Sequence, residues 1–421
     1  MNKNLLIITL FVALTLQLKA QAPASFDVLV KGGHVIDPKN GIDAVMDIAI
    51  KAGKIFKVGK NLPASEAKQV VDATGLKVVP GIIDMHAHVF AGTQPDHYLS
   101  DGLSALMPDG YTFRVGVTTV VDCGGAGWRN FATFKKNVID ISQTRVLSFL
   151  NIVGEGMRGG AYEQDARDMD AKMAAYVAKQ NKKDIVGFKV AHFENAEWTP
   201  VDNAVAAGKL AGDIPVIVDF GGDDSHAPLS IQELFFKHLR PGDIYTHAFT
   251  ELQRRDPIVD FKTRQLKPFI KEAQARGIIF DVGFGGASFA FDQALPAIKA
   301  GFYPNTISTD LHTGSMNNAM KDMLNVMSIF MTMGMEVPAI IKASTWAPAQ
   351  SIKREELGNL SVGSVADLAI LGIREGNFGF FDRIGHKETG TKKFECQATI
   401  RNGKMVYDLN GITTPILLLA K

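Results

Sequence analysis

Cysteine is scarce in this sequence, and neither sign of charge is in excess. The two cysteines among 421 residues, Cys123 and Cys396, lie too far apart for a zinc knuckle or a disulfide framework. The 45 lysines and arginines balance 44 aspartates and glutamates, which leaves no basic stripe for nucleic-acid phosphates or anionic lipid. We therefore predict two free, buried thiols and a small-molecule substrate, with no nucleic-acid partner.

Apolar residues gather at the start of the chain, but the run is too short for a comfortable membrane span. The run extends from Leu5 to Leu18, follows Lys3, and is followed by the small residues Ala20 and Ala22. This order is typical of an export signal, whereas a buried amphipathic helix would need a polar face. We predict a signal peptide over residues 1–20 and, after its removal, an exported, periplasmic protein without a membrane partner.

Short alternating segments of apolar and polar residues occur at both ends of the chain. The segments at 26–31, 34–38, 46–51 and 55–58 predict hairpins, as do those at 366–371 and 398–407, where Asn402-Gly403 forms a turn. Neither end is long enough to build a convincing core alone. We expect residues 21–78 and 346–421 to pair into one composite β-sandwich domain.

Between the two ends, short apolar strands alternate with helical stretches such as 165–179 and 319–333. The strand ends recur about every 32 residues, a spacing that suits a repeating strand–helix unit. A doubly wound sheet is the alternative, but no strand leads into Gly-x-Gly-x-x-Gly at its start. We predict an α/β fold with a (β/α)8 TIM-type barrel over residues 79–345. The predicted strand ends lie near Ile83, Val121, Ile152, Val190, Phe220, His247, Val282 and Asp310.

Four of the eight strand ends carry residues that bind metals or transfer protons, and these are the positions where barrel enzymes place their chemistry. His86 and His88 are two apart on the first strand, so both imidazoles point to one face and can reach one ion. His247 ends the sixth strand and Asp310 the eighth. Taken singly, each is compatible with a structural role, His247 as a satisfied histidine and Asp310 as a capped or paired carboxylate.

Lys189 lies within the apolar fourth strand, where an unpaired ammonium is costly. The ordinary interpretation is a lysine that extends toward solvent or pairs with a carboxylate. Beside metal-binding histidines a second interpretation is favoured. A lysine amine that has reacted with carbon dioxide is an anionic carbamate, and its two oxygens can bridge two cations.

Several distant motifs resemble the amidohydrolase superfamily, and most closely the amidohydrolase/deacetylase metallohydrolases, which are dihydroorotase-like. Their order along the chain agrees with that family, and the resemblance covers nearly all of residues 26–410. The motifs are Gly32–Pro38, Pro80–His88, Phe280–Gly283, Ser308–His312 and Leu357–Leu368, together with Lys189, His247 and Asp310.

The resemblance implies a barrel whose strand ends hold two divalent metal ions. His86, His88 and Asp310 would hold one ion, His247 would help to hold the second, and carboxylated Lys189 would bridge them. Zinc is favoured, with iron, manganese and cobalt as alternatives. The ions would generate a bridging hydroxide, and Asp310 would act catalytically by moving its proton to the leaving nitrogen.

The sequence departs from that family at two strand ends. Relatives normally carry a histidine at the end of the fifth strand, where this chain has Asp219. A carboxylate can replace an imidazole on zinc, so we favour Asp219 as a metal ligand, with His226 as the alternative. Phe284 stands near the seventh strand where relatives often have a histidine, and it can neither bind a metal nor transfer a proton.

Other residues are weaker candidates. His312 follows the eighth strand and is a candidate substrate contact, as are Gly285 and Gly286, which alternatively only form a turn. Cys123 ends the second strand, where a packed thiol is favoured over a thiolate ligand. Several histidines away from these strand ends are interpreted as helix or surface residues: His97, His192, His238 and His386.

These observations predict a metal-dependent hydrolase of non-peptide carbon–nitrogen bonds. The likeness to deacetylases favours removal of an acyl group from an N-acylated, or O-acylated, small molecule. A cyclic amidase of the dihydroorotase or hydantoinase type is the second interpretation, and a catalytically inactive binding barrel is the third. The sequence leaves the metal, the substrate and assembly into a homo-oligomer open.

Overall fold

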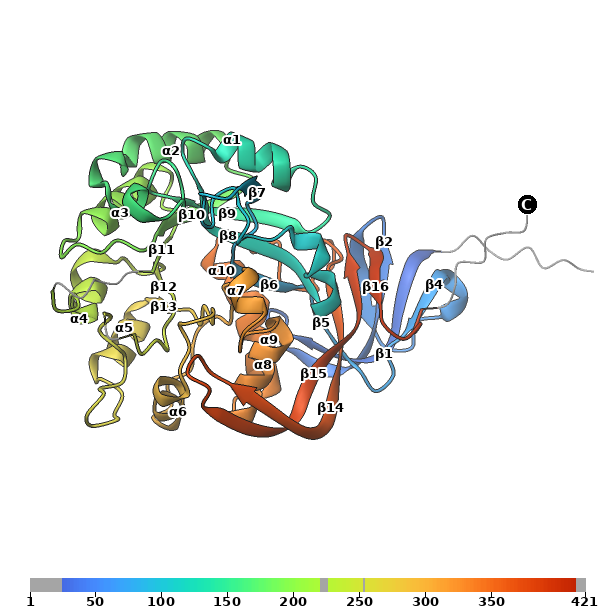
Figure 1. Ribbon diagram of the computed structural model, residues 1–421. Coiled ribbons are helices and arrows are strands. Elements are labelled where there is room, and N and C mark those ends of the chain that lie inside the picture. The colour runs from blue at the N-terminus through green and yellow to red at the C-terminus, as the bar shows by residue number, and fades with distance from the viewer. Residues whose placement is uncertain (1–24, 220–225, 253, 414–421) are drawn as a thin grey trace, which may run out of the picture.

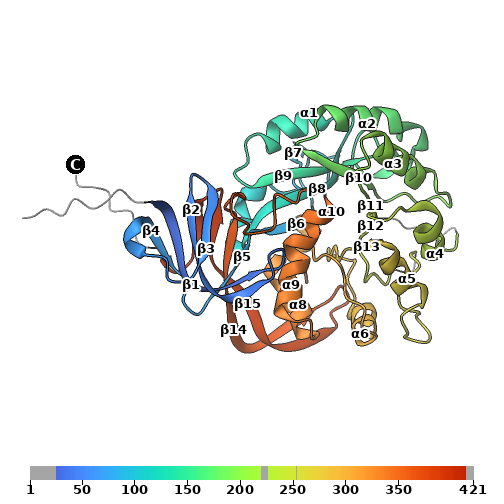
Figure 2. The same ribbon diagram turned by 180° about the vertical axis from the view of Figure 1, so that it is seen from behind.

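The computed structural model describes residues 25–219, 226–252 and 254–413. Figures 1 and 2 show a barrel beside a separate sheet, to which strands from both ends of the chain contribute. The predicted signal peptide at residues 1–20 lies outside the described residues. Within the described ranges, no helix combines the length and apolar character needed to cross a membrane.

The separate sheet joins the two ends of the chain. Its strands follow the order β16-β15-β14-β5-β1-β2-β3, and β4 also pairs with β1. The ends meet where β5 runs antiparallel to β14, with Pro80 opposite Leu368. The two ends therefore pair as expected, and their strands belong to one continuous sheet. The bounds are β1 Phe26–Asp37, β2 Ile42–Lys51, β3 Lys54–Gly59, β4 Ala67–Asp72, β5 Lys77–Pro80, β14 Leu368–Phe381, β15 Lys387–Arg401 and β16 Lys404–Asp408.

Parallel strands form the barrel in chain order, from β6 through β8 to β13. Residues 306–311 close it, because Thr306 bridges to Asp281 on one side and Leu311 bridges to Ala87 of β6 on the other. The predicted (β/α)8 barrel is confirmed, and the carboxyl ends of its strands meet at one rim. The bounds are β6 Ile82–Ala87, β8 Val117–Gly127, β9 Arg145–Asn151, β10 Ile185–Val190, β11 Val216–Val218, β12 Ile244–Tyr245 and β13 Ile279–Phe280; the short β7, Ala91–Gln94, lies outside this sheet.

Helices surround the barrel and follow the apolar pattern expected for strand–helix units (Figure 1). The two predicted helices begin later than expected, because Asp170 and Asp322 act as N-caps and accept hydrogen bonds from the first-turn backbone. The bounds are α1 Phe131–Phe134, α2 Ala171–Gln180, α3 Thr199–Leu210, α4 Ile231–Glu233, α5 Phe269–Arg276, α6 Phe291–Lys299, α7 Thr313–Met316, α8 Met323–Thr332, α9 Val337–Ser344 and α10 Trp346–Ser351.

The interior of the barrel is a packed apolar core that extends beyond the strands. Ile83, Val121 and Phe149 belong to the same buried cluster as Ala349 and Ile352, which come from α10 and the residue after it. Residues just after position 345 thus pack on the barrel, although we assigned them to the composite domain. This packing leaves the opposite rim, where the strands end, for polar side chains.

Candidate metal centre

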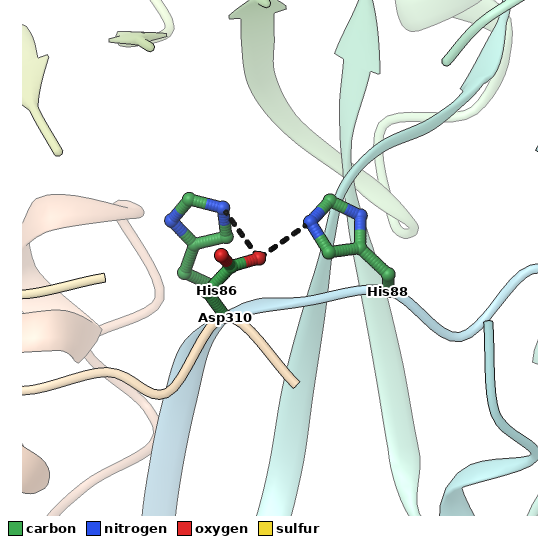
Figure 3. Close-up of side chains that lie close together, drawn as sticks. All are labelled: His86, His88 and Asp310. Atoms are coloured by element: carbon green, nitrogen blue, oxygen red, sulfur yellow. Dashed lines mark ion pairs between the residues drawn. The ribbon is translucent and has the colours of Figure 1, made fainter. Parts of the chain in front are cut away.

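Three buried side chains meet at the rim of the barrel (Figure 3). His86 is the last residue but one of β6, His88 directly follows that strand, and Asp310 comes from the segment that closes the barrel. Asp310 Oδ1 lies 2.8 Å from His88 Nε2 and 3.5 Å from His86 Nε2. One ligand atom from each residue lies within 4.8 Å of the other two, so the group can hold a metal ion.

The backbone of Asp310 adopts an unusual conformation that is held in place by its surroundings. Its φ angle is 53°, in the left-handed region that a residue with a Cβ rarely occupies. Its N–H donates to the carbonyl oxygen of His86 at 2.6 Å, and its own carbonyl oxygen accepts from Ser315 Oγ at 2.7 Å. These contacts fix the direction in which the carboxylate points.

The ring of His86 is oriented by a chain of hydrogen bonds behind it. Thr246 Oγ1 donates to Asp281 at 2.8 Å and accepts from His86 Nδ1 at 2.8 Å. This places the proton of a neutral ring on Nδ1 and leaves the Nε2 lone pair facing Asp310. Asp281 also accepts from Thr306 and Ser308, each at 2.7 Å, so the whole chain is fixed.

The protonation states suit metal ligation. Burial, together with the neighbouring Lys189 charge, lowers the pKa of His86 to about 3, which keeps the imidazole neutral. Burial raises the pKa of Asp310, but His86 and His88 outweigh it and hold that pKa far below its ordinary value. Buried neutral imidazoles and an ionised carboxylate are the ligands that Zn²⁺ and related ions prefer, so the three residues fit such an ion.

A second group of buried side chains, formed by Asp219, His247 and Lys189, lies beside the first group of His86, His88 and Asp310. Asp219 follows β11 and His247 follows β12; the His247 ring centroid lies 4.9 Å from that of His86. His247 Nε2 is 3.2 Å from Asp219 Oδ2, and Arg255 forms an ion pair with the other carboxylate oxygen at 2.5 Å. Although burial raises the pKa of Asp219, the charges of Arg255, His247 and Lys189 hold it well below its ordinary value.

Lys189 joins this group from β10. Its side chain is fully buried, and its Nζ atom has no hydrogen-bond partner among the described residues. The nearest carboxylate oxygen, Asp219 Oδ2, lies 3.8 Å away. A buried ammonium without a hydrogen bond is costly, so this amine is poorly accommodated as it stands.

The structure places His226, the alternative to Asp219, and Phe284, the second departure from the family pattern, as follows. His226 is half-buried, and its Nε2 atom lies 2.6 Å from the carbonyl oxygen of Glu194. Phe284 is buried in the apolar core and stacks on Phe289, with ring centroids 4.4 Å apart. Cys123 and Cys396 are both free and buried, as predicted, and burial raises the pKa of the Cys123 thiol.

The predicted substrate contacts lie around the first group. His312 caps the N-terminus of α7, and its ring centroid lies 6.2 Å from that of His88. Gly285 lies against Asp310, because a Cβ atom there would be 2.6 Å from the carboxylate, whereas Gly286 has more space. Their contact with substrate stays a prediction.

One histidine that we interpreted as a helix or surface residue lies in a loop, partly exposed, with its ring next to the second group. His192 lies in the loop after β10, and its Nδ1 atom is 2.9 Å from the buried carboxylate of Glu163. Its Nε2 atom lies 3.6 Å from Asp219. The sequence feature that could have identified His192 is its position two residues after the barrel strand that carries Lys189. Glu163 and Arg255 have no comparable feature in the sequence.

Comparison with known proteins agrees with the fold. Residues 290–406 match the model of the amidohydrolase family. A deacetylase of Brucella anthropi is 32% identical over 363 residues, covering 84% of this chain and 86% of that protein. The crystal structure of an adenine deaminase superposes with a TM-score of 0.80 at 27% identity, covering 91% of this chain and 100% of that one. The crystal structure of a dihydroorotase superposes with a TM-score of 0.77 at 28% identity, covering 90% of this chain and 99% of that one.

The chain therefore belongs to the amidohydrolase superfamily, as its motifs predicted. It is a hydrolase that acts on carbon–nitrogen bonds other than peptide bonds.

Proposed function

We propose that this protein is a metal-dependent deacetylase that removes an acyl group from a small N-acylated, or O-acylated, molecule. The observation that carries the proposal is the buried group of His86, His88 and Asp310 next to a buried lysine without a hydrogen-bond partner among the described residues. The similarity to the Brucella anthropi deacetylase over most of both chains favours acyl transfer to water over other reactions of the superfamily.

In this proposal the two groups of side chains hold two divalent ions, zinc being favoured by the imidazole ligands. His86, His88 and Asp310 hold the first, and His247 and Asp219 contribute to the second. Bound ions lower the pKa of a coordinated water and polarise the scissile carbonyl. The orientation of His86 by Thr246 and Asp281 serves this binding, because it leaves Nε2 free.

Lys189 acts in the proposal as a carbamate. The ammonium loses one proton, and the resulting amine forms a nitrogen–carbon bond with carbon dioxide and loses a second proton, so that an anion replaces a buried cation. The lack of a hydrogen-bond partner at Nζ within the described part of the chain supports this change, since the free ammonium is poorly stabilised there. The two carbamate oxygens would then be available as ligands both beside His86, His88 and Asp310 and beside His247 and Asp219.

Asp310 moves the proton. Its carboxylate is ionised and faces the centre, so it can accept a proton from the attacking water as the water adds to the carbonyl carbon. It then gives that proton to the leaving nitrogen as the carbon–nitrogen bond breaks. An amide requires this second transfer because an unprotonated amine is a poor leaving group.

A panel of substrates tests the proposal. Zinc-reconstituted enzyme should hydrolyse N-acetyl amino acids or acetylated hydroxy acids, followed by release of acetate. Hydrolysis of cyclic ureides alone would instead support the cyclic amidase, which the similarity to a dihydroorotase structure favours as second candidate. Failure to bind metal after incubation with zinc and bicarbonate would support an inactive barrel.

We also propose that residues 1–20 direct export to the periplasm. The positive start and the apolar run of the sequence support this. Sequencing of the mature N-terminus after expression in a Gram-negative host tests it. A mature chain that begins near residue 21 is expected, and an intact N-terminus in the cytoplasm would contradict it.

A further inference from the structure

His192 is held in a fixed orientation by a buried carboxylate. Its Nδ1 atom lies 2.9 Å from Glu163 Oε2, and Glu163 is only 2% exposed. The other oxygen of Glu163 accepts a hydrogen bond from the backbone N–H of Gly159 at 2.9 Å. A carboxylate on Nδ1 fixes the ring and directs Nε2 to the opposite side, which is the arrangement found behind metal-binding histidines.

The free nitrogen of His192 faces the second group. Asp219 Oδ2 is surrounded by three nitrogen atoms: His247 Nε2 at 3.2 Å, His192 Nε2 at 3.6 Å and Lys189 Nζ at 3.8 Å. Arg255 pairs with the remaining oxygen, Oδ1. Oδ2 is thus directed at His192, His247 and Lys189, whereas Oδ1 is directed away toward Arg255.

The backbone of His192 shares an unusual feature with two residues already placed at the rim. Its φ angle is 53°, compared with 56° for His247 and 53° for Asp310. Such conformations cost free energy in residues with a Cβ and gather where side chains must be aimed. The carbonyl oxygen of His192 accepts from Gln164 Nε2 at 2.7 Å, which holds the loop against the segment that carries Glu163.

The side chain of His192 also borders open space. It is 36% exposed and lines a cavity of about 810 Å³ together with Tyr98, Arg158 and Glu163. An ion or a small molecule can therefore reach the side chain of His192 from solvent.

We propose that His192 is a ligand of the second metal ion, and that Glu163 is its positioning residue. His192 would supply from the loop after β10 the imidazole that Asp219 does not supply at the end of β11. The inference rests on the proposed two-ion function. The second group is wider than the first, because only His86, His88 and Asp310 among the described residues have ligand atoms all within 4.8 Å of one another. Binding of one ion by His192, His247 and Asp219 would therefore require the two imidazoles to move closer to each other.

The test compares metal binding by His192→Gly, Glu163→Gln and the wild-type full chain. Glycine adopts a φ of 53° without strain, so His192→Gly removes the imidazole and leaves the backbone conformation accessible. His238→Ala is the matched control, because His238 also pairs with a carboxylate, Asp202 at 2.7 Å, but stacks on Trp198. Melting of the metal-free proteins checks that each variant folds.

The readouts are ion stoichiometry, dissociation constants for zinc by chelator competition, and the visible absorption of the cobalt-substituted protein. We expect His192→Gly to keep the first ion with unchanged affinity and to bind the second at least tenfold more weakly. Its cobalt spectrum should change, and added imidazole should restore it. Glu163→Gln should weaken the second ion less, and His238→Ala should match the wild type.

Unchanged affinity and an unchanged cobalt spectrum in His192→Gly would overturn the inference and leave the two-ion function intact. Such a result would make His192 only a hydrogen-bonding neighbour of Asp219. A wild-type protein that binds a single ion with the same affinity as His192→Gly would also overturn it. A wild-type protein that binds no ion would remove the proposed function itself.

Discussion

Nε2 of His88 lies 2.8 Å from Oδ1 of Asp310, although His88 follows the first strand of the barrel and Asp310 comes from the segment that closes it. The contact exists because residues 306–311 bridge to both β6 and the chain after β13. Closure of the barrel therefore brings together the group of His86, His88 and Asp310. A metal ion held there would connect the two ends of the barrel sequence directly.

Replacement of Asp310 by asparagine should lower kcat by about 10²- to 10⁴-fold, because the amide cannot accept and return the proton. Asparagine keeps the size of the side chain and one oxygen for the ion. Steady-state kinetics, with zinc content measured on the same sample, checks this. Asp202→Asn, at a partly exposed ion pair with His238, is the control and should retain full activity. An active Asp310→Asn enzyme would exclude Asp310 as the proton carrier.

Lys189→Ala should lose the second ion and nearly all activity, because the carbamate oxygens disappear. Short carboxylic acids should restore part of both by occupying the space that the side chain leaves. The measurement is activity and zinc content against added acetate or propionate. Lys189→Ala with full activity and no added acid contradicts the bridging role.

Gly285→Ala should destabilise the fold and weaken the first ion. A Cβ atom there would lie 2.6 Å from Asp310 Oδ2, and the φ angle of 62° disfavours any side chain. We expect a loss of about 1–3 kcal/mol in the free energy of unfolding and at least tenfold weaker zinc binding. Gly286→Ala is the control, since its nearest neighbours would be 3.8 Å away. Equal zinc affinity in the two variants argues against a tight fit at Asp310.

The buried carboxyl of Asp84 should make stability depend on pH. Burial raises its pKa from the ordinary 3.8 to about 7, against hydrogen bonds from Thr309 that lower it. The folded state thus holds the proton more tightly than the unfolded chain does. The contribution of protonated Asp84 to the free energy of unfolding is therefore lost as the pH rises from about 4 through about 7. Asp84→Asn should remove this loss, and its melting temperature relative to wild type should rise between pH 5 and pH 8. Parallel curves for the two metal-free proteins would contradict the shift.

The sequence was sufficient for the barrel and for the residues at its strand ends. His86, His88 and Asp310 are separated along the chain, but parallel strands place their carboxyl ends at one rim, so the residues converge. The pairing of β5 with β14 was likewise predictable, because each chain end had strands and lacked enough apolar residues for its own core.

The contacts made by loops could not be read from the sequence in the same way. His192 reaches Asp219 only because its backbone turns into the left-handed region and Glu163, 29 residues earlier, holds its ring. Arg255 meets Asp219 from a different loop. The periodicity of apolar residues predicts strands and helices, but it does not predict which residues such loops contact. The orientation of His86 depends in the same way on Thr246 and Asp281, which directly follow β12 and β13.

Anomalous diffraction from crystals grown with zinc and bicarbonate tests the central claim most directly. The account predicts two anomalous peaks at the barrel rim, one bound by His86, His88 and Asp310 and one beside Asp219 and His247, with extra density on Lys189 Nζ. Crystals that show no zinc at the rim, or zinc only at surface histidines, would contradict it.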